Sequence, residues 1–295
     1  MRPGESFVAA VLVLAVGSGE ARADVWNRTY KVGAHPSLDV RTADGAVEVR
    51  SWDRAEIAIQ VETEGWKIGA DGVRVEAEQR DNAVILNVRE PSFDINLFSF
   101  HNRRIRVTLD VPRELDARVH TGDGAVDLAP LTGTIHVSTG DGRIRAHGLK
   151  GDLTLGSGDG HITGTDLDGR LSVRTGDGDV DLAGRFDVLD IQTGDGRIEA
   201  DARAGSRVAE DGWTITSGDG PVTLQLPNGF AADLEARTGD GHISVALEGG
   251  WRGQVDGHRV RGTLNGGGGP LRIRTGDGSV EIGNGEAPKP SPRSN

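Results

Sequence analysis

The sequence predicts an all-β protein: a single-stranded parallel β-solenoid (β-helix) with coils of about 18 residues and a β-rich insert near its N-terminus. Three observations predict this fold class. The tetrapeptide Thr-Gly-Asp-Gly recurs along the chain, apolar and polar residues alternate on both sides of each copy, and glycine fills 45 of the 295 positions. That glycine content is about twice the usual share, which is typical of a chain that turns often.

The repeated tetrapeptide sets the coil length. Its copies, some with serine in the first place, begin at Thr121, Thr139, Ser157, Thr175, Thr193, Ser217, Thr238 and Thr275. The first five starts are 18 residues apart, and the later gaps are 24, 21 and 37. An isolated earlier copy begins at Thr42. A constant period near 20 residues is typical of solenoids, in which each position stacks on its equivalent about 4.8 Å away.

The residues around each copy predict short strands with one buried face. Leu153 and Leu155 precede one tetrapeptide and Ile162 follows it, each separated from the next apolar residue by a polar one or by the turn. The Asp-Gly pair between them predicts a turn in which glycine is free to take positive φ. A third recurring apolar position, Leu149 here, predicts a third short face. A hairpin meander is the competing arrangement, but the constant phase favours stacked coils.

The N-terminal sequence predicts that the protein is exported. An apolar run over 7–16 is followed by Ala21-Arg22-Ala23, which fits the small-x-small cleavage rule and places the mature start at Asp24. Ten apolar residues are too few for a helix that spans a membrane, which needs about 20. No later stretch is long and apolar enough either. We therefore expect a chain exported to the periplasm, the extracellular space or the cell surface.

Four segments follow from these patterns. They are a signal peptide over 1–23, a first coil plus an antiparallel β-rich cap over 24–112, the β-solenoid repeats over 113–284 and a disordered tail over 285–295. Within the second segment, residues 53–112 predict four strands whose spacing suits an antiparallel sheet. Such a sheet would cover one open end of the stacked coils.

Composition excludes several classes of function. The chain has no cysteine, which excludes disulfides, zinc–thiolate sites, iron–sulfur clusters and cysteine nucleophiles. Its net charge of −12 argues against a nucleic-acid partner, which normally needs a basic footprint. No nucleophile elbow, phosphate-binding loop or zinc-protease motif is present, so no catalytic residue is assigned.

The repeated aspartate is the first candidate site. In stacked coils the carboxylates would form a column, which includes Asp141, Asp159, Asp177 and Asp195. A row of calcium ions would relieve their repulsion, and calcium is the one cofactor that this pattern suggests. Each coil offers one carboxylate, however, whereas calcium takes six to eight oxygens. We therefore expect each aspartate to accept backbone N–H bonds in its turn, with no metal and no cofactor.

An apolar loop is the second candidate. The segment that contains Phe93, Phe98 and Phe100 holds three of the five phenylalanines of the mature chain. Such a loop is either a partner-docking patch or part of the cap over the open end of the rod. We expect the cap.

The export signal, the early copy at Thr42, a strand-rich insert that ends in Val111-Pro112 and the Thr-Gly-Asp-Gly coils resemble the bacterial putative-adhesin family of unknown function. The resemblance covers about residues 30–282 and implies a β-solenoid envelope protein without accepted catalytic residues. We expect a non-catalytic exported protein of the cell envelope, an adhesin or a recognition or scaffold rod, with a protein or polysaccharide partner. The alternatives are a polysaccharide-acting β-helix enzyme and a periplasmic envelope-stress or signalling partner.

Overall fold

A computed structural model describes residues 23–91, 103–247 and 249–284. Within these ranges the chain forms 23 strands and no helix, which confirms the prediction of an all-β protein. No described segment is therefore a helix that could cross a membrane. The strands are β1 (Asp24–Lys31), β2 (Ser37–Thr42), β3 (Ala46–Trp52), β4 (Glu56–Glu64), β5 (Arg74–Arg80), β6 (Ala83–Arg89), β7 (Arg104–Pro112), β8 (Asp116–Thr121), β9 (Val126–Leu128), β10 (Thr132–Thr139), β11 (Ile144–His147), β12 (Lys150–Ser157), β13 (Ile162–Arg174), β14 (Val180–Thr193), β15 (Ile198–Ala202), β16 (Trp213–Ser217), β17 (Val222–Leu226), β18 (Ala232–Arg237), β19 (Ile243–Ala246), β20 (Trp251–Asp256), β21 (Arg259–Leu264), β22 (Pro270–Arg274) and β23 (Val280–Asn284).

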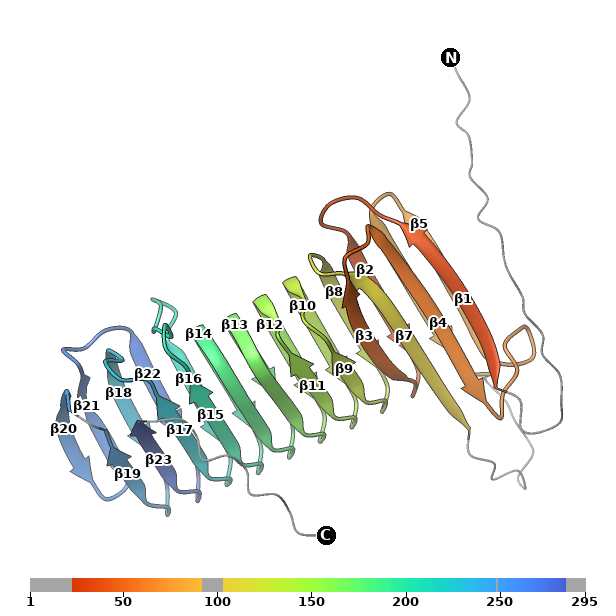
Figure 1. Ribbon diagram of the computed structural model, residues 1–295. Coiled ribbons are helices and arrows are strands. Elements are labelled where there is room, and N and C mark those ends of the chain that lie inside the picture. Colours follow the sequence, from red (N-terminus) through yellow and green to blue (C-terminus); the bar gives the residue numbers. More distant parts are fainter. Residues whose placement is uncertain (1–22, 92–102, 248, 285–295) are drawn as a thin grey trace, which may run out of the picture.

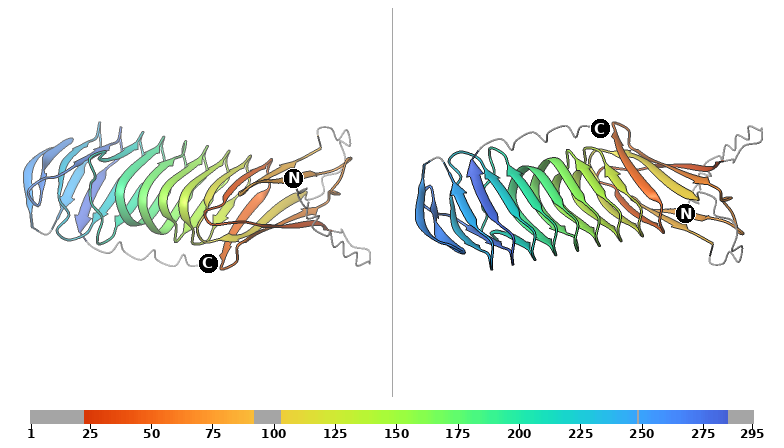
Figure 2. Two further views of the ribbon diagram at one scale, coloured as in Figure 1. Left: turned by 90° about the horizontal axis from the view of Figure 1, so that it is seen from above. Right: turned by 90° about the horizontal axis from the view of Figure 1, so that it is seen from below.

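The strands stack into two faces around one apolar core (Figures 1 and 2). Face A follows the order β5–β6–β2–β8–β10–β12–β13–β14–β16–β22–β18–β21–β20. Face B follows the order β1–β4–β7–β3–β9–β11–β13–β14–β15–β17–β23–β19. The long strands β13 and β14 contribute to both faces. We use the word level for one strand, or part of a long strand, of face A together with the strand of face B that follows it in the chain.

Like residues stack on like in the middle of the chain. Ile135 pairs with Leu153, which pairs with Leu171, in parallel strands of face A. On face B, Ile144 pairs with Ile162 in the same way. All five side chains are buried, and the outward residues between them are polar or partly exposed. Burying an aliphatic side chain stabilises a fold by about 1.5–3 kcal/mol, so these ladders supply much of the stability of the stack.

The N-terminal end is a mixed sheet, so the expectation of an antiparallel insert holds for β5–β6 and β4–β7 but not for the pairing of β6 and β7 with the stack. β6 pairs in parallel with β2, and β7 pairs in parallel with β3. Their buried residues are in phase with the level below, as Leu86 pairs with Val40 and Leu109 with Val49. The antiparallel partners lie outside them, where β5 pairs with β6, and β4 pairs with β7 and β1.

The first and last levels in sequence lie inside the stack. β2 and β3 lie between β6/β7 and β8/β9. At the other end, β22 lies between β16 and β18, and β23 lies between β17 and β19 (Figure 1). The hairpin of β20 and β21 then pairs beyond β18 on face A. At the C-terminal end, therefore, the outermost strands β19 and β20 come from the interior of the sequence, whereas at the N-terminal end β5 is outermost on face A and β1 on face B.

The third face that the sequence suggested is absent from the described residues. Leu149 is buried in the corner that links β11 to β12, and β13 passes through the equivalent corner as one continuous strand. The leucine at this position closes the side of the core between the two faces. A second set of corners therefore needs only a few residues, some of them in left-handed conformations such as Asp166, with φ of 54°.

Candidate functional site

The hydroxyl of each tetrapeptide joins one level to the next. Thr139 Oγ1 lies 2.9 Å from the carbonyl oxygens of both Gly122 and Gly124, and it accepts a hydrogen bond from the N–H of Gly142 at 3.3 Å. Thr139 is only 6% exposed. The same hydroxyl contacts recur at Thr121, Ser157, Thr175, Thr193, Ser217, Thr238 and Thr275. The first residue of the motif is therefore a buried structural group.

The glycines of the Thr-Gly-Asp-Gly motif allow neighbouring turns to pack closely against one another. The expectation that they have positive φ is wrong. None of the glycines in the Thr-Gly-Asp-Gly copies has a positive φ. A Cβ on Gly142 would overlap the carbonyl group of Gly124 in the level below. A Cβ on Gly140 would overlap the Oδ1 atom of Asp123. Stacked turns leave no room for a side chain at either position.

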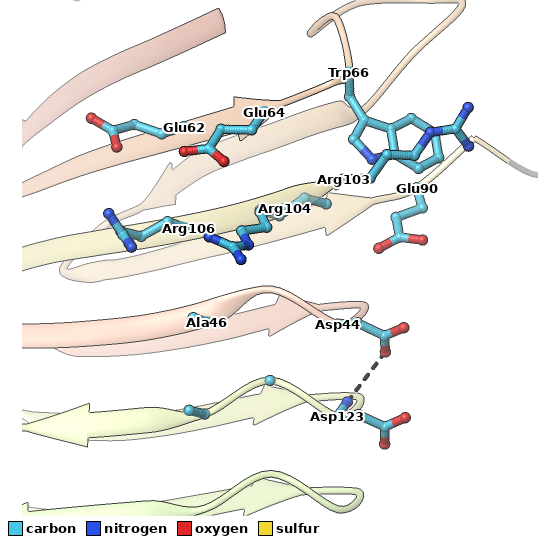
Figure 3. Close-up of a pocket in the computed structure, with 13 residues that line it drawn as sticks. Asp44, Ala46, Glu62, Glu64, Trp66, Glu90, Arg103, Arg104, Arg106 and Asp123 are labelled. Carbon is cyan, nitrogen blue, oxygen red and sulfur yellow. Dashed lines mark hydrogen bonds between the residues drawn. The ribbon is translucent and has the colours of Figure 1, made fainter. Parts of the chain in front are cut away.

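The motif aspartates form an exposed row along one edge of the stack. Asp141 donates its backbone N–H to Oδ1 of Asp123 at 3.2 Å, and Asp123 donates to Oδ1 of Asp44 in the same way (Figure 3). The candidate calcium ligands Asp141, Asp159, Asp177 and Asp195 all belong to this row and are exposed. Each level contributes one carboxylate, and no three His, Cys, Asp or Glu side chains of the described chain converge as a metal site would require.

Glu90 continues this row, which the sequence analysis missed. Val88 pairs with Thr42, so Glu90 takes the position of Asp44 one level higher. The Asp44 carboxylate and the Glu90 carboxylate both line the same groove (Figure 3). Burial raises the pKa of Glu90, and the negative charge of Asp44 raises it further. The available signal was the spacing, because Glu90 follows Val88 as Asp44 follows Thr42.

A groove of about 430 Å³ lies above the end of this row, at a level whose sequence has no Thr-Gly-Asp-Gly copy (Figure 3). β6 and β7 form the level above β2 and β3, but residues 90–103 connect them in place of a Thr-Gly-Asp-Gly turn. The groove is lined by Asp44, Ala46, Glu62, Glu64, Trp66, Glu90, Arg103, Arg104, Ile105, Arg106, Asp123, Gly124 and Ala125. Beneath it, the Thr42 hydroxyl is buried and has no hydrogen-bond partner within the described ranges.

Arginines and one indole give the groove its recognition chemistry. The Arg103 guanidinium lies over the Trp66 ring, 4.5 Å from its centroid. Arg104 and Arg106 are exposed on β7, directly across from Glu64 and Glu62 on β4. Neither of these two arginines makes a salt bridge to a described residue. Ala46 and Ala125 follow Arg106 in the next levels, and their small side chains leave the groove open.

Face B beside the groove carries ion pairs between levels. Arg145 lies 3.7 Å from Asp127, and Arg197 lies 3.1 Å from Asp179, as the 18-residue phase predicts. Each of these pairs is at least partly exposed to solvent, so each contributes only about 0–1 kcal/mol. These charges neutralise one another. The candidate patch Phe93, Phe98 and Phe100 lies outside the described residues.

A family comparison covers both the row and the groove. The sequence pattern of the Toastrack DUF4097 family matches residues 35–283, most of the chain. The chain belongs to this family. No curated protein matches the Toastrack chain.

Solved structures similar to the Toastrack chain come from several bacteria. A putative lipid binding protein from Parabacteroides distasonis is 12% identical with a TM-score of 0.49, and the match covers 88% of this chain and 96% of the other. A putative adhesin from Parabacteroides merdae is 14% identical with a TM-score of 0.42 and the same coverage. A putative cell adhesion protein from Clostridium sporogenes is 16% identical with a TM-score of 0.30, over 88% of this chain and 100% of the other.

Proposed function

We propose that this chain is a non-catalytic, exported protein of the cell envelope. In this proposal it is a stiff β-solenoid with coils of about 18 residues that recognises an extended protein or polysaccharide. It would act as an adhesin or a recognition rod, in the periplasm or at the cell surface. The observation that carries the proposal is the groove beside Trp66, where Arg104 and Arg106 have no ion-pair partner among the described residues.

This function is supported by the contrast between polar groups that bond within the protein and polar groups that do not. The hydroxyl of Thr139 and Oδ1 of Asp123 are used in bonds between levels. Charges further along face B, such as Arg145, form ion pairs. In the groove, Arg104 and Arg106 make no salt bridge to a described residue and remain available to a partner. A binding site needs a few polar groups that converge on a cavity whose shape is already formed, and the groove provides them.

The chemistry of the groove suits an extended polar chain. Arg104 and Arg106 lie two residues apart on one strand, so both project from the same side of β7. Guanidinium groups bind carboxylates and hydroxyls through several N–H donors. The carboxylates of Glu62 and Glu64 supply acceptors, and the indole of Trp66 supplies an apolar surface. Sugars and polypeptides both present this mixture of donors, acceptors and apolar patches.

The cellular location of the protein distinguishes adhesion at the cell surface from a role in the periplasm. Intact cells of the source bacterium should be treated with an added protease, and the chain from Asp24 to Asn295 then detected with an antibody. Loss of the band places the protein on the surface and supports adhesion. Survival until the outer envelope is opened supports a periplasmic recognition or signalling role. Presence of the full, uncleaved chain in the cytosol contradicts export.

A binding assay tests the groove. The purified chain should be sedimented with protein-free peptidoglycan and, separately, with the surface polysaccharide of the source bacterium. We expect Arg106→Ala and Trp66→Ala each to reduce the bound fraction by about tenfold, which corresponds to about 1.4 kcal/mol. Arg118→Ala is the matched control for Arg106→Ala, because Arg118 is also an exposed arginine but lies on face A. Equal loss in the control, or no loss in either groove variant, contradicts the proposal for these ligands.

One observation favours the enzymatic alternative. Asp181 and Glu199 pair across β14 and β15, and burial, followed by the charge of Glu199, raises the pKa of Asp181. Glycosidases usually use two carboxyl groups that flank the bond to be cleaved. Against this role, Arg197 lies 3.3 Å from Glu199 and also pairs with Asp179, which ties these acids into a structural network. Polysaccharide cleavage that Asp181→Asn abolishes would establish the enzyme.

A further inference from the structure

A row of arginines crosses face A at the C-terminal end of the stack, far along the chain from the groove. Arg274 on β22 pairs with Arg237 on β18, which pairs with Arg259 on β21. One step along the same strands, Arg272 and Arg261 flank Glu235. These three strands lie side by side at the blue end of the stack (Figure 1). We name these five arginines the arginine patch.

The arginine patch is unusual in a chain whose net charge is −12. Its outward positions on β22, β18 and β21 hold five arginines but only two carboxylates, Asp233 and Glu235. Like charges that lie directly opposite in neighbouring strands destabilise a sheet. On face B, by contrast, neighbouring levels place Asp179 beside Arg197. A surface that served only solubility would not need to place three arginines in one row.

The carboxylates beside the patch pair with only two of its arginines, although Asp256 on β20 lies opposite Arg259. Glu235 accepts hydrogen bonds from Arg237 and, at 3.0 Å, from Arg261. These two bonds hold the pKa of Glu235 below its ordinary value, so it is ionised at neutral pH. Arg259, Arg272 and Arg274 make no salt bridge to any residue in the described ranges. In addition, Nε of Arg237 is buried and donates to no acceptor there.

We propose that the arginine patch binds phosphate groups. A guanidinium presents a rigid fork of N–H donors that matches the oxygens of a phosphate, and its charge persists at any physiological pH. Adjacent strands are about 4.8 Å apart, so one phosphate can contact two neighbouring arginines. A ligand with two linked phosphates would span the row from Arg274 to Arg259. This site lies on the opposite face from the groove and does not depend on the function proposed for it.

Calorimetry with inorganic pyrophosphate tests the proposal on the purified chain. We expect saturable binding at low salt that weakens as salt is added, because the attraction is between exposed charges. The double variant Arg274→Gln/Arg259→Gln should bind at least about tenfold more weakly. Arg118→Gln is the control, since it removes one exposed arginine from the same face outside the patch. Its affinity should match that of the wild type.

Melting temperatures show whether each variant is folded, so that a loss of structure is not mistaken for a loss of binding. Removing like charges relieves repulsion, so the double variant should melt no lower than the wild type without phosphate. Pyrophosphate should raise the melting temperature of the wild type and of Arg118→Gln, but not that of the double variant. Absence of binding in the wild type, or equal binding by the double variant, overturns the proposal.

Vesicles identify the source of the phosphate. The chain should be sedimented with phosphatidylcholine vesicles that contain or lack phosphatidic acid. Binding only to the acidic vesicles, lost in the double variant, supports a lipid headgroup. Pyrophosphate binding without vesicle binding supports a soluble phosphorylated ligand. Self-association at low salt without phosphate, lost in the same variant, would instead show that the carboxylates of a second copy occupy the patch, and that result overturns the proposal.

Discussion

Thr139 Oγ1 lies 2.9 Å from the carbonyl oxygens of both Gly122 and Gly124, one level below it in the stack. The hydroxyl therefore connects two turns that are separated in sequence but adjacent in space. It also accepts the N–H of Gly142 from its own turn. Because this contact recurs along the stack, the tetrapeptide acts as a joint between levels, and its residue types follow from packing and hydrogen bonding.

The first prediction concerns this hydroxyl. Thr139→Val keeps the shape of the side chain but leaves buried carbonyl groups without their donor, which should cost about 1–3 kcal/mol of unfolding free energy. Thr139→Ser should cost less, since serine makes the same contacts at Ser157. Urea denaturation measures both. Thr132→Val is the control, because Thr132 is exposed, and a loss there as large as at Thr139 would contradict the assignment.

The second prediction compares two glycines. Gly142→Ala should destabilise the protein by more than about 2 kcal/mol, because the new Cβ would overlap the backbone of Gly124. At Gly156 the nearest atoms to a new Cβ lie 3.9 Å away and φ is ordinary. Gly156→Ala should therefore be neutral or slightly stabilising. Calorimetric melting of the two variants decides the matter, and similar melting temperatures would disprove the packing argument.

The regular part of the fold was predictable because its period is constant. The 18-residue phase predicts that Leu153 stacks between Ile135 and Leu171, and these residues do pair. The need for glycine was also predictable, although its cause was not. Positive φ is a property of one residue, whereas the overlap at Gly142 depends on the level below, which only the stacked structure reveals.

The third prediction concerns Trp213, where the repeat first lengthens. Trp213 pairs with Leu189, is fully buried, and contacts Phe186 and Phe230 with ring centroids 6.2 and 5.0 Å away. Trp213→Ala should cost about 3–5 kcal/mol through the cavity that it leaves. Trp251→Ala, at a partly exposed position, should cost clearly less. Chemical denaturation followed by circular dichroism gives both values, and equal costs would argue against an aromatic core at this level.

The fourth prediction is a pH dependence. Hydrogen bonds from Arg185, together with those from Arg207, hold the pKa of Asp187 below its ordinary value. The folded state thus binds this proton more weakly than the unfolded state, so ionised Asp187 stabilises the fold above about pH 4, and that contribution is lost as pH falls through the folded pKa. Asp187→Asn should be less stable at neutral pH and should lose less on acidification. Urea midpoints from about pH 6 to about pH 2 measure this.

Asp53→Asn is the matched control for that experiment. Asp53 also pairs with an arginine, Arg113 at 2.8 Å, but its side chain is 82% exposed. Because an exposed pair contributes only about 0–1 kcal/mol, Asp53→Asn should lose little stability at neutral pH. If Asp187→Asn loses stability with acid as steeply as the wild type does, the stabilising role of Asp187 is wrong.

The fifth prediction is also a pH dependence, but the pKa of Glu90 is raised whereas that of Asp187 is lowered. Burial and the charge of Asp44 raise the pKa of Glu90, so its ionised form opposes folding as pH rises above the ordinary value for glutamate. Glu90→Gln removes the charge and keeps the size of the side chain, so it should melt higher than the wild type at pH 7. The difference should shrink as pH falls and Glu90 of the wild type becomes protonated. Melting curves in which Glu90→Gln gains nothing at pH 7 would contradict the effect of burial on Glu90.

Neither the groove nor the arginine patch could be predicted from the sequence, and the reason is the same for both. Arg237 and Arg274 are neighbours only because β22 returns to a place beside β18, and the irregular gaps in the repeat conceal that return. Arg106 and Ala46 meet because β7 stacks on β3 after a long detour. A periodic pattern predicts neighbours within the period, and both sites lie where the period is broken.

The position of β22 and β23 has a consequence for how the protein is made. These strands are the last of the described chain to be synthesised, yet they separate β16/β17 from β18/β19. A ribosome or a secretion channel therefore delivers the central levels in order. At the distal end, the positions of β22 and β23 stay unfilled until residues 270–284 emerge. Contacts between segments so distant in sequence form slowly. Release of the C-terminus, rather than growth of the repeat, would set the moment at which the rod becomes complete.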